Sequence, residues 1–85
     1  MKLYIKSSKS GFDLQSLLYE DFSYADRKLK ELGYKFVESE EATRNTEYAI
    51  YENGNNYCRL EYELVYMSGD RYYAGSIASV YEYQL

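Results

Sequence analysis

The sequence predicts an α+β fold in a single domain over residues 1–85, with one amphipathic helix packed on one face of an antiparallel sheet. Three observations predict it. Apolar residues recur every three or four positions between residues 14 and 32, which is the spacing of a helix with one buried stripe. Apolar and polar residues alternate in the C-terminal half, as in strands with one buried face. No proline, repeat or low-complexity tract marks a boundary between domains.

The predicted elements begin with a short strand at residues 2–6, where apolar and polar residues alternate. The helical pattern starts at Asp13, but Ser23 followed by Asp26 offers a second start of the capping-box type. A break of the helix near Ser23 is therefore left open. Gly33 ends the helix as a left-handed cap. The apolar stripe consists of Leu14, Leu18, Phe22, Ala25, Leu29 and Leu32.

The remaining chain predicts a short strand at residues 34–38 and an acidic loop from Glu38 to Asn45. After this loop, Gly and Asn clusters separate three apolar and polar alternations, which indicates a meander of antiparallel strands. The expected sheet thus has a three-stranded C-terminal meander plus N-terminal strands. The strands of the meander are residues 46–52, 57–67 and 71–83.

Matching apolar with apolar side chains across the strands predicts the register of the meander. A three-residue loop that pairs Asn53 with Tyr57 is favoured for the first hairpin, and a two-residue turn at residues 69–70 for the second. Cys58 falls on the core face of the middle strand, where a buried thiol is expected rather than a reactive one. The predicted core pairs are Ile50 with Leu60, Tyr48 with Tyr62, Tyr66 with Tyr73, Tyr62 with Ile77, and Cys58 with Tyr81.

Composition and charge limit the classes of function. The chain has no His and a single Cys, which excludes disulfides, Cys/His zinc sites and Cys–His nucleophile pairs and favours a reducing, cytoplasmic setting. Neither a signal peptide nor a membrane span is expected, and so no membrane partner. Residues 1–36 carry a net charge of +2, whereas residues 37–85 carry −6. This acidic half disfavours direct binding of nucleic acid and favours a basic protein surface as partner.

The face of the sheet turned away from the helix is predicted to combine tyrosines with carboxylates. Tyrosine is enriched in protein interfaces, and carboxylates beside its hydroxyls accept hydrogen bonds from Arg and Lys. Binding of a basic protein partner is the preferred interpretation, while a homodimer and plain exposure to solvent stay open. No cofactor is expected. The candidate partner-binding residues on this face and the acidic loop are Glu38, Glu40, Glu41, Tyr51, Tyr57, Glu61, Glu63, Asp70 and Tyr72.

The best constellation for catalysis is a group of carboxylates in the meander. Glu61 and Glu63 lie two apart on one strand face, and the predicted register puts Glu47 opposite Glu63. Such a set could hold Mg²⁺ or act as a hydrolase pair. Alternating Glu is also what strands facing solvent contain, so the sequence predicts a protein that is not an enzyme.

Small size, absence of Pro and His, 13 tyrosines, acidic strands and one helix together resemble small anti-defence proteins of phages and mobile elements. The chain looks most like the type II anti-CRISPR inhibitors, and the resemblance is one of overall character without a diagnostic motif. It implies a DNA-mimic inhibitor in the cytoplasm of a bacterial host, with a basic channel of a CRISPR effector nuclease as partner. Carboxylates such as Glu38, Glu40 and Glu41 would then stand in for phosphates. An antitoxin or a homo-oligomeric assembly protein is the alternative.

Overall fold

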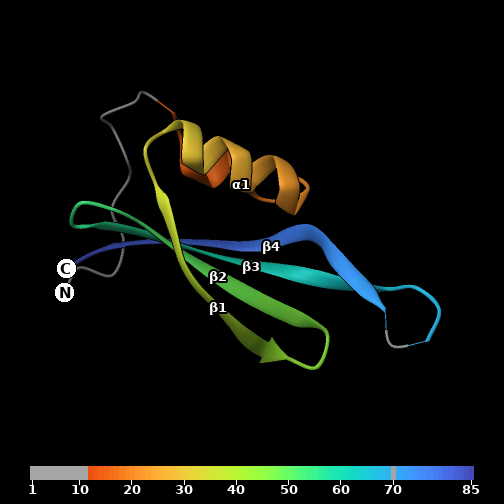
Figure 1. The fold of residues 1–85 in the computed structure, drawn as a ribbon. Coiled ribbons are helices and arrows are strands. Elements are labelled where there is room, and N and C mark those ends of the chain that lie inside the picture. The colour runs from red at the N-terminus through yellow and green to blue at the C-terminus, as the bar shows by residue number, and fades with distance from the viewer. Residues whose placement is uncertain (1–11, 70) are drawn as a thin grey trace.

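The computed structural model describes residues 12–69 and 71–85 as one helix lying on a four-stranded antiparallel sheet. The strands follow one another as a meander in the order β1-β2-β3-β4 (Figure 1). Their bounds are Lys35–Thr43 for β1, Thr46–Asn53 for β2, Asn56–Tyr66 for β3 and Tyr72–Gln84 for β4. The α+β class is confirmed. The strand expected at residues 2–6 lies outside the described residues.

The acidic segment predicted to be a loop is instead part of a strand. β1 extends to Thr43 and pairs with β2, so that the turn contains only Arg44 and Asn45. All nine residues of β1 are exposed. The strand expected at residues 34–38 is the first part of β1, whereas its extension through the acidic segment was missed because it buries no side chain and shows no apolar alternation.

The helical region consists of two pieces separated by a break. A 3-10 helix, η1, covers Leu14–Leu17, and the α-helix α1 covers Phe22–Glu31. Between them the backbone of Tyr19 and Glu20 exchanges hydrogen bonds of 2.9 and 2.8 Å with Ile77 of β4. The helix therefore restarts close to the second start considered from the sequence, although Asp21 and not Ser23 is the N-cap residue.

The C-terminal end of α1 forms as predicted. Gly33 has a φ of 98°, and the amide of Tyr34 donates to the carbonyl of Leu29 at 2.9 Å. This bond closes a helix end in which glycine takes the left-handed conformation without a steric penalty. The chain turns there and enters β1.

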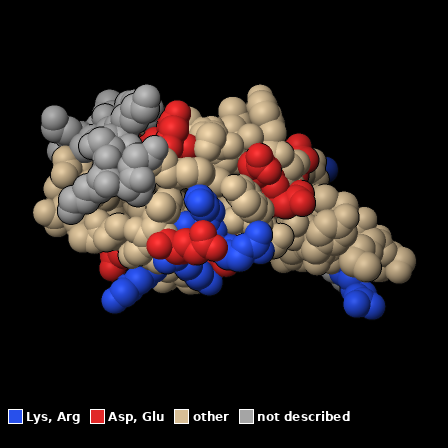
Figure 2. Space-filling view, turned by 90° about the horizontal axis from the view of Figure 1, so that it is seen from above, with Lys and Arg blue, Asp and Glu red and all other residues tan. Residues whose placement is uncertain are grey.

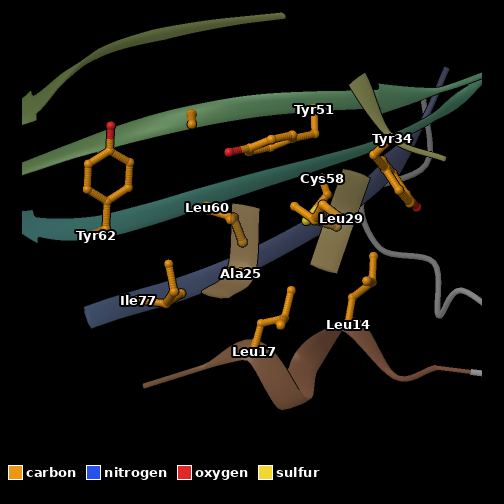
Figure 3. Close-up of a cluster of buried hydrophobic side chains, with 11 residues drawn as sticks. Leu14, Leu17, Ala25, Leu29, Tyr34, Tyr51, Cys58, Leu60, Tyr62 and Ile77 are labelled. Atoms are coloured by element: carbon orange, nitrogen blue, oxygen red, sulfur yellow. The ribbon is translucent and has the colours of Figure 1, made fainter. Parts of the chain in front are cut away.

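The core lies between α1, η1 and one face of the sheet, as Figure 3 shows. Burial of Cys58, Leu60 and Tyr62 on this face of β3 confirms the predicted core strand. The apolar packing of small domains supplies most of their stability. The fully described core cluster contains Leu14, Leu17, Ala25, Leu29, Tyr34, Ala49, Tyr51, Cys58, Leu60, Tyr62 and Ile77.

The predicted register of the first hairpin is wrong by one residue. The loop has two residues, because Asn53 pairs with Asn56, and this sets Ala49 opposite Leu60. A slip of one residue turns every side chain of a strand to the other face. Ile50 lies opposite Arg59 as a result, away from the core.

The predicted register of the second hairpin is confirmed at one residue pair and wrong at two. Tyr62 pairs with Ile77 as expected. Between the pairs Glu61–Ser79 and Leu64–Ala74, β4 contains two more residues than β3. These extra residues shift the register of β4 against β3 on either side of the Tyr62–Ile77 pair. The pairs observed in place of the predicted ones are Tyr66 with Tyr72 and Cys58 with Glu82.

Several tyrosines assigned to the core consequently lie elsewhere. Tyr66 and Tyr73 are 53% and 54% exposed, and Tyr48 and Tyr81 are half-buried on the face away from α1. Of the five tyrosines assigned to the core, Tyr62 is confirmed. No helix among the described residues is long and apolar enough to cross a membrane.

Candidate protein-binding face

The side of the sheet opposite α1, called the open face below, is covered by no described helix or strand (Figure 1). Its members alternate with the core residues along each strand. The face carries five carboxylates and two cations. It comprises Lys35, Glu38, Glu40, Tyr48, Ile50, Glu52, Tyr57, Arg59, Glu61, Glu63, Ser79, Tyr81 and Tyr83.

Arg59 and four tyrosine rings form the centre of the open face. The guanidinium carbon of Arg59 lies 5.4 Å from the ring centroid of Tyr48 and 5.1 Å from that of Tyr81. The rings of Tyr57 and Tyr83 stack with centroids 5.2 Å apart. Cation–π contacts of this kind favour a fixed position of the cation. The guanidinium of Arg59 is thus held between the rings of Tyr48 and Tyr81.

Carboxylates border these rings and accept hydrogen bonds from neutral hydroxyls. Glu40 accepts from the hydroxyl of Tyr48 at 2.5 Å, and Glu61 accepts from that of Thr46 at 3.0 Å. The hydrogen bond to Glu40 raises the pKa of Tyr48 above its ordinary value, so the donor is retained further into the alkaline range. The ion pairs between described residues both lie on α1, and they are Lys28 with Glu31 and Lys30 with Asp26. The carboxylates of the open face are left without a paired cation from the described residues.

The structure brings five of the nine candidate residues together on the open face. These are Glu38, Glu40, Tyr57, Glu61 and Glu63. Glu38, Glu40 and Glu63 are exposed, and the other two are half-buried. These five predicted residues come from β1 and β3, and β2 and β4 supply the further tyrosines of the face.

Tyr51 is predicted on the face away from the helix, and this prediction is wrong. It is fully buried in the core, where its hydroxyl donates to Asp26 of α1 at 2.6 Å. Burial raises the pKa of Tyr51, and the hydrogen bond to Asp26 adds to that effect. A buried side chain cannot contact a partner. Asp70 lies outside the described residues.

Glu41 and Tyr72 lie on the helix side of the sheet, beyond the end of α1. There Glu47, which pairs with Glu41 across the strands, accepts from the hydroxyls of Tyr62 at 3.1 Å and Tyr72 at 3.3 Å. The negative charge of Glu47 raises the pKa of Tyr72. Figure 2 views the molecule from this side and shows several carboxylate side chains gathered on it. These residues form a group separate from the open face.

The carboxylate constellation considered for catalysis is not formed. Glu47 pairs with Tyr62 and faces the helix side, whereas Glu61 and Glu63 belong to the open face. The one-residue error in register produced the apparent cluster. In the described part of the chain, no group of three His, Cys, Asp or Glu side chains is arranged to hold a metal ion.

The sequence interpretation missed several members of the open face. The pattern predicts Tyr48 and Tyr81 in the core, whereas the structure places them on the open face, and it does not indicate Tyr83 or Glu52 as members of that face. A two-residue loop at Gly54 and Asn55 is a common hairpin turn and would have placed Tyr48 correctly. The bulges that move Tyr81 give no comparable signal in the sequence.

Comparisons of the chain with protein-family models, with curated proteins and with solved structures give no match.

Proposed function

We propose that this chain is a non-catalytic binding protein that occupies a basic, nucleic-acid-binding surface of a bacterial protein through its open face. The supporting observation is that the central cation of this face is held by aromatic rings, while its carboxylates lack a paired cation among the described residues. Arg59 is held between two tyrosine rings, while Glu38, Glu40 and Glu61 have no paired cation among the described residues. An approaching Arg or Lys side chain finds free carboxylate oxygens beside aromatic rings on which a guanidinium stacks.

The same arrangement favours a protein partner over a nucleic acid. Stacked rings such as Tyr57 and Tyr83 could also receive bases. However, five carboxylates against two cations give the open face a net negative charge, which repels a phosphate backbone. A surface that has evolved to bind nucleic acid supplies the opposite charge. Occupation of that surface would exclude its nucleic acid, as in inhibitors of the anti-CRISPR type, and a CRISPR effector nuclease is one member of this partner class.

Affinity capture from a bacterial lysate tests the proposal. The immobilised chain is expected to retain a basic protein that is eluted by salt, and nucleic acid should compete with the chain for that protein. The double variant Glu38→Lys with Glu61→Lys should weaken the captured complex by at least about tenfold, because it reverses charge at the contact.

The matched control changes the same number of charges on the helix side. Glu20 and Glu31 are exposed there, and the double variant Glu20→Lys with Glu31→Lys should leave binding within about twofold, since screened charges far from a contact have little effect. Equal weakening by both double variants would show that only net charge matters. Unchanged binding in the open-face variant would overturn the proposal.

Self-association is a second candidate, and it is favoured by a different surface. The end of the β3–β4 hairpin exposes Tyr66, Met67, Tyr72 and Tyr73 by 47 to 55%. Figure 2 shows this end of the molecule, beyond the helix, as mainly uncharged side chains. Large apolar and aromatic side chains exposed at one end of a molecule are typical of contact surfaces. Light scattering of the purified chain separates a stable homodimer, which this candidate predicts, from a monomer that awaits a foreign partner.

A further inference from the structure

The outer edge of β1 is a second feature that points to a protein partner. β1 is the first strand of the sheet and pairs with β2 along one side only among the described residues. All nine of its residues are exposed, including Phe36 and Val37 at 47% and 45%. An exposed edge presents backbone N–H and C=O groups that an added strand can pair with.

Along this edge, the glutamates of β1 lie on both faces of the sheet. Register shifts near Val37 and Ala42 bound a regular stretch, Glu38–Glu41, in which three of the four residues are glutamates. Glu38 and Glu40 belong to the open face, and Glu41 lies on the helix side beside Glu47. A strand laid against this stretch would meet carboxylates on each of its own two faces.

This pattern opposes pairing of β1 with a second copy of itself. A two-fold axis at Ser39, the middle residue of β1, would set Glu38 of one copy directly opposite Glu40 of the other, and the reverse. Like charges opposite each other across strands destabilise the pair, whereas opposite charges stabilise it. In this register the edge disfavours its own copy, and its three glutamates favour a cationic strand.

We propose that the outer edge of β1 receives a short β-strand of the partner in which Lys or Arg alternates with uncharged residues. Main-chain hydrogen bonds would supply affinity without regard to sequence, and the glutamates would supply the selection for positive charge. The inference rests on the proposed function for the sign of the partner's charge. It adds the mode of contact, which is strand addition at an edge rather than docking on a face.

A synthetic cyclic β-hairpin tests this mode without the natural partner. One strand of the peptide alternates Lys with Val, and two D-Pro-Gly turns hold it extended, so that the ordering cost of a free peptide is removed in advance. The control peptide has the same charge but carries N-methyl groups on the outward amides of the Lys strand, which abolishes backbone pairing. Fluorescence anisotropy measures both affinities for the full chain.

We expect the methylated hairpin to bind at least about tenfold more weakly, because it keeps only the charge attraction. Amide resonances of residues 35–43 should shift on addition of the unmethylated hairpin and gain protection from hydrogen exchange. The variant Glu38→Lys with Glu40→Lys should lose binding by a similar factor, whereas Glu20→Lys with Glu31→Lys should stay within about twofold.

Three outcomes would overturn the inference. Equal affinity of the two hairpins would mean that charge alone attracts them, and binding of neither would mean that the glutamates only protect the edge. Slow exchange of the outer amides of β1 in the free chain would mean that the edge is already covered. If a captured bacterial partner still depended on Glu38 and Glu61 in these cases, the proposed function would stand and only the edge contact would fail.

Discussion

Replacement of Tyr51 by Phe tests the core, the register and the assignment of the binding face together. The hydroxyl of Tyr51 donates to Asp26 at 2.6 Å, and Asp26 also lies 3.1 Å from the ammonium of Lys30. The ring itself makes an edge contact with Phe36 at a centroid distance of 5.7 Å. Tyr51→Phe removes the hydrogen bond and keeps the ring in place, so its effect reports the bond between β2 and α1.

The expected loss follows from the surroundings of Asp26. A hydrogen bond to a charged group contributes about 1.5–3 kcal/mol to stability. Lys30 still faces the carboxylate in the variant, and the Asp26 side chain is 26% exposed, so water replaces part of the lost bond. We therefore expect a loss of about 1.5 kcal/mol, at the lower end of that range. For a domain of this size that loss corresponds to a fall in Tm of roughly 6–12 °C.

Urea unfolding followed by circular dichroism measures this loss in a double-mutant cycle of Tyr51→Phe and Asp26→Ala. The coupling energy should be about 1–2 kcal/mol, and the single variant Tyr48→Phe, whose hydroxyl is bonded on the open face, should cost less than about 0.5 kcal/mol. Coupling below about 0.5 kcal/mol would refute the contribution assigned to the bond. Loss of partner binding by a folded Tyr51→Phe chain would refute the placement of Tyr51 in the core.

Three further predictions concern the pH dependence of stability, Arg59 of the open face and Gly75 of β4. Burial raises the pKa of Tyr62 and that of Cys58 to about 12 each, so both stay protonated in the folded chain while the unfolded chain ionises near its ordinary values. Stability should thus be full below about pH 9 and fall from there towards pH 12, and a urea midpoint that is constant between pH 8 and 11 would contradict this. Arg59→Met should cost about 1 kcal/mol in urea unfolding, because two cation–π contacts are lost, and should steepen the salt dependence of partner binding; an unchanged midpoint would count against the contacts. Gly75→Ala would put a Cβ 2.8 Å from a methyl group of Val65 and should destabilise by about 1–3 kcal/mol. The second change Val65→Ala should recover part of that loss, and the absence of any recovery would locate the strain elsewhere.

Much of the fold follows from local patterns. The three-to-four spacing of leucines predicted a helix, and Gly33 predicted its end because only glycine adopts the left-handed cap without strain. The turn residues near positions 54 and 69 predicted the strands of the meander to within one or two residues. Alternation in β3 predicted the burial of Cys58 and Leu60. These features depend on residues close together in the chain, which a sequence pattern records.

The choice between Ile50 and its neighbours as core residues did not follow from such patterns. Pairing Ile50 with Leu60 matched apolar with apolar, but the structure buries Ala49 and Tyr51 instead. Tyr51 fills the space beneath α1 and bonds with Asp26, a partner that is 25 residues away in sequence. The contact of Tyr51 with the helix agrees with the two-residue loop at Gly54 and Asn55, whereas matching apolar residues across the two strands favoured the other register.

By itself, the sequence determined the α+β class, the helix and its cap, the central strand of the core, and an acidic, tyrosine-rich character in the second half of the chain. The tertiary structure decided which tyrosines meet the carboxylates. The reason is that one residue of register exchanges the faces of β2, and bulges shift β4 against β3. The extension of β1 from residue 39 to Thr43 was also decided there, since a segment that buries no side chain leaves no apolar period in its sequence.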